Sequence, residues 1–172
     1  MIKIGIITGS IRDVRVNAQV AEHFKAVAES KNIADATFEI VDIKDYQLPI
    51  FNEALPPAMA NKQYGNEAVQ SWSNKIDELD GYIFVTPEYN KSITSALKNN
   101  IDYLGSEWNH KSAGIVGYGS TLGIAAINSL RGILANFKLA DVTPHGAFNI
   151  FTDFENMQNF VYYMTYNPTY CI

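Results

Sequence analysis

Two arginines and a serine stand close together in a segment near the N-terminus, GSIRDVRVN. Gly9 permits a tight turn, Ser10 supplies a hydroxyl, and Arg12 and Arg15 can each donate charge-assisted hydrogen bonds to a dianionic phosphate. Backbone N–H groups at a helix start would add to such an anion site, and Asn17 is expected to be the N-cap. The alternative is a capped helix start with two solvated arginines. The lysine and the spacing of a P-loop are both missing.

A second segment, TPEYN, offers groups that suit a flat heteroaromatic ring. Such a ring needs close backbone approach, an aromatic neighbour and a bidentate amide, which Pro87, Tyr89 and Asn90 can provide. The alternative is a plain strand-to-helix turn in which the proline ends the strand. A third segment, Gly117–Gly123, has Gly-x-Gly but not the third glycine of a dinucleotide fingerprint. It would place bare backbone N–H groups beside the first two segments, or form an ordinary glycine-rich turn.

The elements that must position these segments alternate between short apolar runs and stretches of helical period. Near-continuous apolar runs are typical of strands covered on both faces, as in a parallel sheet. The predicted strands are Ile2–Thr8, Thr37–Ile43, Gly81–Thr86, Ala113–Tyr118 and a short one near Ala140–Val142. The predicted helices are Asn17–Ser30, Glu67–Leu79, 93–104 and Ile124–Phe137. Lys44–Gly65 has three prolines and little periodicity, and it is interpreted as a long surface loop.

This alternation predicts an α/β fold with a parallel sheet, right-handed crossovers and helices on both sides. No internal repeat, low-complexity tract or linker occurs, so residues 1–172 are expected to form one domain. Ligands of open α/β sheets bind beyond the carboxyl ends of the strands, where all three segments lie. One segment suits a phosphate and two suit a planar ring, which is the layout of a mononucleotide such as FMN.

The bulk composition excludes several classes of partner. The net charge is −5 without any Lys/Arg run, which argues against nucleic acid. No apolar run approaches the length of a membrane helix, and no signal segment precedes the first strand, so a cytoplasmic protein is expected. Cys171 is the single cysteine and can form no intrachain disulfide. It and the three histidines show no metal-ligand spacing, so no metal site is expected.

At these segments the chain resembles the NADPH-dependent FMN reductase family, which includes azoreductases, quinone reductases and chromate reductases. The matching pieces cover most of residues 1 to 145: GSIRDVRVN, LPIFNE, TPEYNKSITSALKNNIDYL, EW, GIVGYGS and LRGIL. The combination of GSIRxxRxN with TPEYNxS at this distance is much more specific than either half. The resemblance implies a flavodoxin-like three-layer α/β/α fold with a five-stranded parallel sheet in the order 2-1-3-4-5.

The resemblance also implies a function. The expected protein is an FMN-dependent NAD(P)H oxidoreductase that reduces quinones, azo or nitro compounds, metal ions or free flavin by ping-pong hydride transfer, using NADPH or NADH. A homodimer or higher homo-oligomer is implied as well. No side chain is expected to act as a catalytic nucleophile, because the flavin carries the chemistry. The implied cofactor-binding residues are Ser10, Arg12, Arg15, Val16 and Asn17 for the phosphate side, and Pro87, Glu88, Tyr89, Asn90, Gly119 and Ser120 for the ring.

Three positions depart from the family pattern. Thr94 stands where the family usually has a proline, Leu122 replaces a glycine and Ala125 replaces an arginine. The tail Phe154–Ile172 is rich in tyrosine, has Glu155 as its only charged side chain, and does not resemble the family's closing amphipathic helix.

Two other functions remain open at this level. A flavodoxin-type electron carrier would share the fold and cofactor, although its first loop usually lacks paired arginines. A flavin-binding sensor or regulatory module could use the unusual tail as a contact surface. A serine hydrolase is disfavoured, because no Gly-x-Ser-x-Gly elbow occurs.

Overall fold

A five-stranded parallel sheet forms the centre of the computed structural model, which describes residues 1–161. The strand order is β2-β1-β3-β4-β5, and every neighbouring pair is parallel. The strands are β1 (Ile2–Thr8), β2 (Ala36–Asp42), β3 (Gly81–Pro87), β4 (Ser112–Gly119) and β5 (Ala140–Asn149). The predicted flavodoxin-like sheet and its strand order are therefore confirmed.

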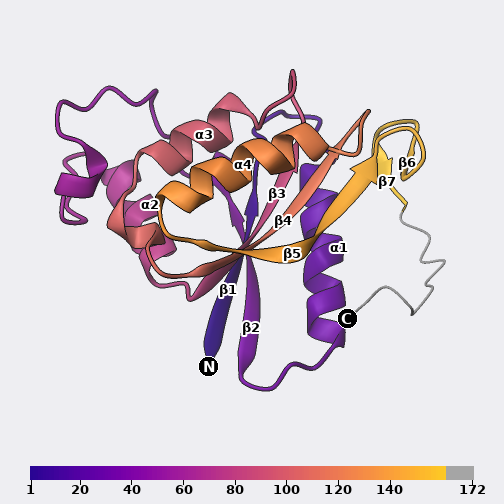
Figure 1. Cartoon of the computed structure of the whole chain (residues 1–172), viewed down its shortest axis with the longest axis horizontal. Helices are drawn as coiled ribbons and strands as arrows, with labels where there is room; N and C mark the ends of the chain where they lie inside the picture. The colour runs from indigo at the N-terminus through magenta and orange to yellow at the C-terminus, as the bar shows by residue number, and fades with distance from the viewer. Residues whose placement is uncertain (162–172) are drawn as a thin grey trace.

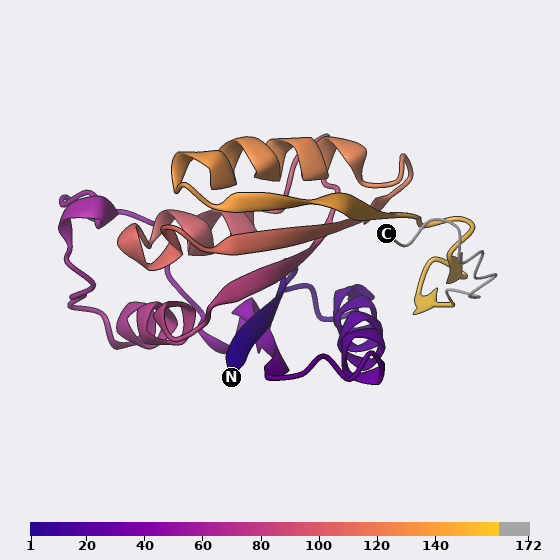
Figure 2. The same ribbon diagram turned by 60° about the horizontal axis from the view of Figure 1, so that its bottom comes forward.

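Four α-helices of this region connect the strands (Figure 1). They are α1 (Asn17–Ser30), α2 (Glu67–Asp77), α3 (Ser95–Asp102) and α4 (Ile124–Asn136). The chain steps from β1 outward to β2 and then reverses toward β3, β4 and β5. Right-handed crossovers consequently place α1 on one face and the other three helices on the opposite face. Figure 2 shows α1 and α4 on opposite sides of the sheet.

Each face of the sheet has its own apolar core. The larger core lies under α2, α3 and α4 and includes Trp72, Trp108 and Phe84, all fully buried. The smaller core lies under α1 and contains Val20, Ile6 and a group of aromatic side chains from the C-terminal part of the chain. The predicted loop between β2 and α2 contains two short 3₁₀ helices, Ile43–Asp45 and Pro57–Met59, and a third, Ser106–Trp108, precedes β4.

The C-terminal part differs most from the expectation. The fifth strand extends to Asn149 instead of ending near Val142, because an edge strand tolerates Pro144 and a register shift opposite Gly114 and Val116. An antiparallel hairpin follows, β6 (Phe154–Glu155) and β7 (Asn159–Phe160), beyond the carboxyl end of β5 and beside α1 (Figures 1 and 2). Most of the unusual tail, with Cys171, lies outside the described residues.

The prediction that Asn17 caps α1 is wrong. Val16 occupies the N-cap position, and no side chain caps the helix. The Asn17 side chain is buried and bonded elsewhere, as described below. Within residues 1–161, no helix is long and apolar enough to cross a membrane.

Candidate functional site

A pocket of about 550 Å³ opens at the carboxyl ends of β1, β3 and β4, between the loops that follow these strands. Its size lies in the range of small-molecule sites. The structure brings together nine of the eleven residues expected to bind a cofactor. They are Ser10, Arg12, Arg15, Val16, Pro87, Glu88, Tyr89, Gly119 and Ser120. Asn17 and Asn90 do not line it.

Gly9 and Asn17 fix the shape of the loop between β1 and α1. The Asn17 amide oxygen accepts the Gly9 N–H at 2.9 Å, and its amide nitrogen donates to the Val85 carbonyl at 2.9 Å. A Cβ on Gly9 would lie 2.8 Å from the Val85 oxygen, so only glycine allows the loop to pack against β3. Asn17 therefore holds the loop against the end of β3, next to the pocket.

Two features of this loop suit an anion. The backbone N–H groups from Asp13 to Val16 have no acceptor among the described residues, and they stand at the uncapped start of α1. The Arg12 guanidinium is exposed beside them and pairs with no carboxylate in residues 1–161. Unpaired donors and an unpaired cation in one pocket match the oxygens of a phosphate, so the loop fits that part of FMN.

Arg15 is placed differently from Arg12. One terminal nitrogen donates to an oxygen of Asp42 at 2.8 Å, and the other donates to the second oxygen. Arg15 also donates to the Ser10 carbonyl. Burial by itself raises the pKa of Asp42, but hydrogen bonds from Arg15, from the Lys44 N–H and from the Thr8 hydroxyl outweigh it, so this pKa lies below its ordinary value. The Arg15 charge is already neutralised, and the residue mainly holds the loop against the end of β2.

The opposite wall of the pocket comes from the loops after β3 and β4. Only 6% of the Glu88 side chain is exposed, and its carboxylate accepts the Ala125 N–H at 2.9 Å and the Thr121 hydroxyl at 3.1 Å. Burial by itself raises the pKa of Glu88, but these hydrogen bonds and the nearby Lys91 outweigh that effect. The pKa therefore lies below its ordinary value, and the carboxylate is ionised. Glu88 thus joins the two loops, while the half-exposed Tyr89 ring and the backbone of Gly119 face the pocket.

Asn90 lies in a tight turn outside the pocket lining. Asn90 and Lys91 have φ values of 49° and 68°, and the backbone groups of Tyr89 and Ser92 bond to each other across them. This pattern is a type I′ turn, for which asparagine is well suited. The predicted role of Asn90 as an amide partner of the ring has no support from this position.

Among the positions that depart from the family pattern, Thr94 has a local structural role, and nothing in the structure explains Leu122. The Thr94 hydroxyl caps α3 by accepting the Leu97 N–H at 3.0 Å, and it donates to the Gly9 carbonyl at 2.6 Å. It therefore connects α3 to the loop after β1. Leu122 has a φ of 63°, a left-handed conformation that costs a non-glycine residue energy.

The sequence interpretation missed one wall of the pocket. Gln19 of α1, Ile150, Phe151 and the residues from Asn156 to Asn159 also line it. No signal marked the hairpin, because its strands have two residues each and lack the length over which alternation can be recognised.

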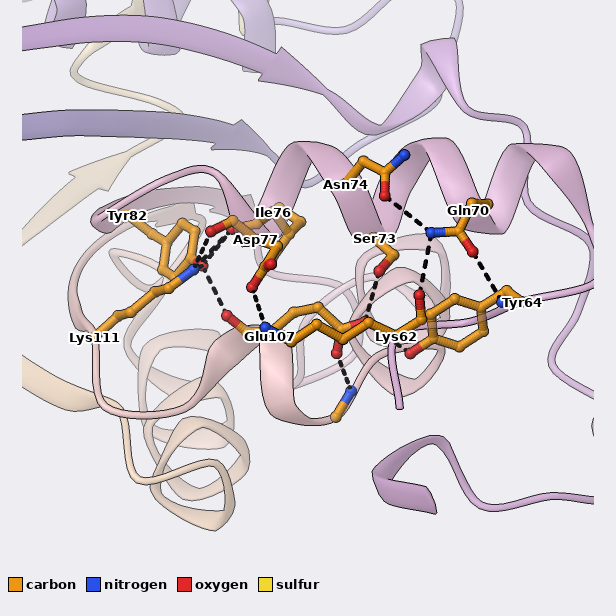
Figure 3. Close-up of polar contacts among 11 residues, drawn as sticks. Lys62, Tyr64, Gln70, Ser73, Asn74, Ile76, Asp77, Tyr82, Glu107 and Lys111 are labelled. Atoms are coloured by element: carbon orange, nitrogen blue, oxygen red, sulfur yellow. Dashed lines mark hydrogen bonds and ion pairs between the residues drawn. The ribbon is translucent and has the colours of Figure 1, made fainter. Parts of the chain in front are cut away.

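A second polar cluster lies at the other end of the sheet, near the first residues of β3 and β4 (Figure 3). The fully buried Glu107 carboxylate accepts hydrogen bonds from the Tyr64 hydroxyl (2.8 Å), the Ser73 hydroxyl (2.7 Å) and the Gly105 N–H (3.0 Å). Lys111 donates to the last carbonyls of α2 and to the Tyr82 hydroxyl. These groups satisfy one another, which indicates a structural role. In the part of the chain that the structure describes, no cluster of three or more His, Cys, Asp or Glu side chains could hold a metal ion.

Comparison with known proteins gives consistent results. The sequence model of the family described as NADPH-dependent FMN reductase matches residues 2–153. An NAD(P)H-dependent FMN reductase from Nectria sp is 41% identical over 146 residues, which are 84% of this chain and 73% of that protein. An NAD(P)H-dependent FMN reductase from Saccharomyces cerevisiae is 36% identical, with 80% and 75% covered.

A 2-hydroxy-1,4-benzoquinone reductase from Burkholderia sp is 31% identical, over 78% of this chain and 70% of that protein. Among solved structures, the flavoenzyme NAD(P)H:(acceptor) oxidoreductase FerB from Paracoccus denitrificans superposes with a TM-score of 0.72. The two chains share 20% sequence identity over 94% of this chain and 87% of the other. At that identity the likeness shows the fold alone.

Proposed function

We propose, because the chain belongs to the NADPH-dependent FMN reductase family, that the pocket beyond β1, β3 and β4 is its FMN site. The protein is an FMN-dependent NAD(P)H oxidoreductase that reduces small acceptors. When bound, FMN would supply the redox chemistry by which electrons from NAD(P)H reach a second molecule in a ping-pong sequence. The protein contributes binding, orientation and the exclusion of water.

The observation that carries the site assignment is the unpaired Arg12 beside unbonded backbone N–H groups at the start of α1. In this proposal Arg12, Ser10 and the N–H groups of the loop, up to Val16, hold the FMN phosphate. Arg15 and Asn17 keep the loop in place through Asp42 and Val85.

The ring is proposed to lie against the loops after β3 and β4. Pro87, Tyr89 and the backbone of Gly119 and Ser120 face the pocket, and Glu88 holds the two loops together. No side chain in the pocket pairs a nucleophile with a general base, which fits chemistry carried by a cofactor. Quinones and azo compounds are the proposed acceptors, and nothing favours an electron carrier or a sensor without turnover.

We further propose a domain organisation, a compartment and an oligomeric state for the enzyme. Residues 1–172 form one domain that acts in the cytoplasm as a homodimer, in keeping with the family resemblance. The acidic net charge of −5 supports a protein that binds neither nucleic acid nor a membrane.

Steady-state kinetics test the reaction sequence. With FMN-loaded enzyme, varied NADPH and several fixed concentrations of a benzoquinone, parallel double-reciprocal lines are expected. Intersecting lines would mean that both substrates must be bound together, and this would contradict the ping-pong sequence.

A further inference from the structure

The hairpin of β6 and β7 forms one side wall of the pocket, and the sequence pattern did not predict this wall. Phe151 and the residues from Asn156 to Asn159 line the cavity together with the loops after β1, β3 and β4. The hairpin is connected to β5 by a tight bend, in which the Asp153 carboxylate accepts the Asn149 N–H at 2.7 Å. The wall is therefore held at a defined distance from the end of the sheet.

Gln19 attaches the hairpin to α1. Its side-chain nitrogen donates to the Gln158 carbonyl at 3.1 Å, and its oxygen accepts the Phe160 N–H at 3.0 Å. One amide side chain thus bonds the hairpin backbone in two places. On the inner side, the buried Phe154 ring packs against Tyr118, with 5.5 Å between ring centroids, and against Phe160 at 4.9 Å. These contacts fix the base of the hairpin and leave its tip at the pocket.

The tip of the hairpin has an unfavourable residue for its backbone. Asn156 and Met157 have φ values of 51° and 56°, and the Gln158 N–H bonds to the Glu155 carbonyl at 3.0 Å, which defines a type I′ turn. The second position of such a turn favours glycine. Methionine is strained there, and strain of this kind often persists at functional positions. The Met157 side chain lines the pocket and is 55% exposed.

Four exposed apolar or aromatic side chains from separate segments line the pocket, among exposed polar ones such as Arg12 and Ser120. Val14 follows β1, Tyr89 follows β3, and Phe151 and Met157 belong to the wall, with exposed fractions of 76%, 37%, 63% and 55%. Apolar side chains gathered around a pocket mouth are typical of a binding site. The hairpin residues that line the pocket carry no charge, and three of them, Asn156, Gln158 and Asn159, have amide side chains.

Resting on the proposed function, we propose that this wall selects the electron acceptor, with Phe151 and Met157 as its specificity-determining residues. The favoured acceptors are uncharged, planar and aromatic, such as alkylated naphthoquinones. Such rings can pack against the Phe151 ring and the Met157 thioether, while the wall amides bond to carbonyl oxygens. Anionic acceptors are disfavoured, because they would lose hydration against an uncharged wall while Arg12 is engaged by the FMN phosphate.

Two variants test the wall with the fold intact. Met157→Gly removes the side chain and relieves the positive φ, so its melting temperature should not fall. Phe151→Ala removes an exposed ring. Lys138→Gly is the matched control, since Lys138 also has a positive φ (55°) but lies after α4, away from the pocket.

The measurement compares kcat/KM for 2-methyl-1,4-naphthoquinone with kcat/KM for ferricyanide, an anion, in FMN-loaded enzyme with NADPH. We expect the quinone-to-ferricyanide ratio to fall at least tenfold in each wall variant and to stay at the wild-type value in Lys138→Gly. A second readout without turnover is calorimetric binding of coumarin, an uncharged planar compound, to the FMN-loaded protein. Its dissociation constant should rise at least fivefold in both wall variants.

Several results would overturn the proposal. An unchanged ratio with unchanged coumarin binding would remove the wall from acceptor selection. A loss of FMN affinity in the wall variants, with the ratio unchanged, would assign the wall to the cofactor. If the wall variants changed only the sedimentation mass of the protein, and neither the ratio nor coumarin binding, the wall would be assigned to a contact between subunits. Failure of the wild-type protein to retain FMN or to be reduced by NADPH would instead refute the proposed function itself.

Discussion

Arg15 donates from both terminal nitrogens to the two carboxylate oxygens of Asp42, and this ion pair joins the loop after β1 to the end of β2. The side chains are only 13% and 20% exposed, so the pair is shielded from solvent. Arg12, three residues earlier, has no such partner among the described residues. The two arginines of one loop are therefore expected to differ in function, with one holding the loop and the other meeting the ligand.

The first prediction concerns Arg12. Replacing it in Arg12→Ala should weaken FMN binding by about 1–3 kcal/mol, because a charge-assisted hydrogen bond to the phosphate is lost. Stability of the apoprotein should not change, since the side chain has no protein ion pair. Fluorescence titration of FMN measures the affinity, and Lys138→Ala serves as a surface-cation control. Equal FMN affinity in Arg12→Ala and the control would exclude Arg12 from the site.

Arg15→Lys should mainly lower the stability of the apoprotein, in contrast to Arg12→Ala, which should mainly lower FMN affinity. A lysine keeps the charge but cannot bond to both oxygens of Asp42, so the apoprotein should lose about 1–2 kcal/mol of unfolding free energy. FMN affinity should fall less than in Arg12→Ala. Urea denaturation of the two apoproteins provides the comparison, and a larger loss of stability in Arg12→Ala would reverse the two roles.

The Arg15–Asp42 pair also predicts a pH dependence. The folded-state pKa of Asp42 is depressed, so the pair stabilises the fold fully above the ordinary aspartate pKa of about 4. This contribution is lost as the pH falls below about 4 and through the depressed folded value. The unfolding free energy of wild type should thus fall more steeply from pH 5 to 3 than that of Asp42→Asn. Asp35→Asn, at an exposed carboxylate that forms no ion pair among residues 1–161, should follow wild type. Identical slopes in wild type and Asp42→Asn would contradict the expectation.

Thr94 offers a test of the connection between α3 and the cofactor loop. Thr94→Val keeps the shape but loses the helix cap and leaves the Gly9 carbonyl without its donor, so a loss of about 1–3 kcal/mol in stability is expected. FMN affinity should fall as well, because Gly9 begins the loop. Thr94→Ser retains the hydroxyl and should restore both properties. If Thr94→Ser were as impaired as Thr94→Val, the hydroxyl would not be the cause.

Glu107 gives a prediction away from the site. Glu107→Ala would leave the Tyr64 and Ser73 hydroxyls and the Gly105 N–H without their acceptor, which should cost roughly 2–4 kcal/mol of unfolding free energy. The FMN dissociation constant of the protein that remains folded should stay close to wild type. A selective loss of FMN affinity at unchanged stability would show that this cluster does more than support the fold.

The sheet and its helices could be predicted because each element carries its own pattern. β1 is a mostly apolar run that stops at Gly9, and α2 places Val69, Trp72 and Ile76 on one face. The length of β5 could not be predicted, because Pro144 and Gly146 interrupt its pattern and only its position at the sheet edge makes them acceptable.

The candidate site was predictable as a set of segments but not as a set of contacts. Local sequence showed that residues near Arg12 and Tyr89 would meet at one end of the sheet. It could not show that Arg15 pairs with Asp42, or that Asn17 donates to the Val85 carbonyl, because Asp42 and Val85 lie far from this loop in the sequence. The hairpin wall was missed for the same reason, because Gln19 and aromatic contacts position it, not a local pattern.

The most direct test of the central claim is an anaerobic spectrum. Purified protein is loaded with FMN, freed of unbound flavin, and recorded in the visible range before and after one equivalent of NADPH. We expect flavin to stay with the protein and its visible absorbance to bleach on mixing. Retained flavin that remains oxidised, or flavin that is lost with the unbound fraction, would contradict an FMN-dependent NAD(P)H oxidoreductase.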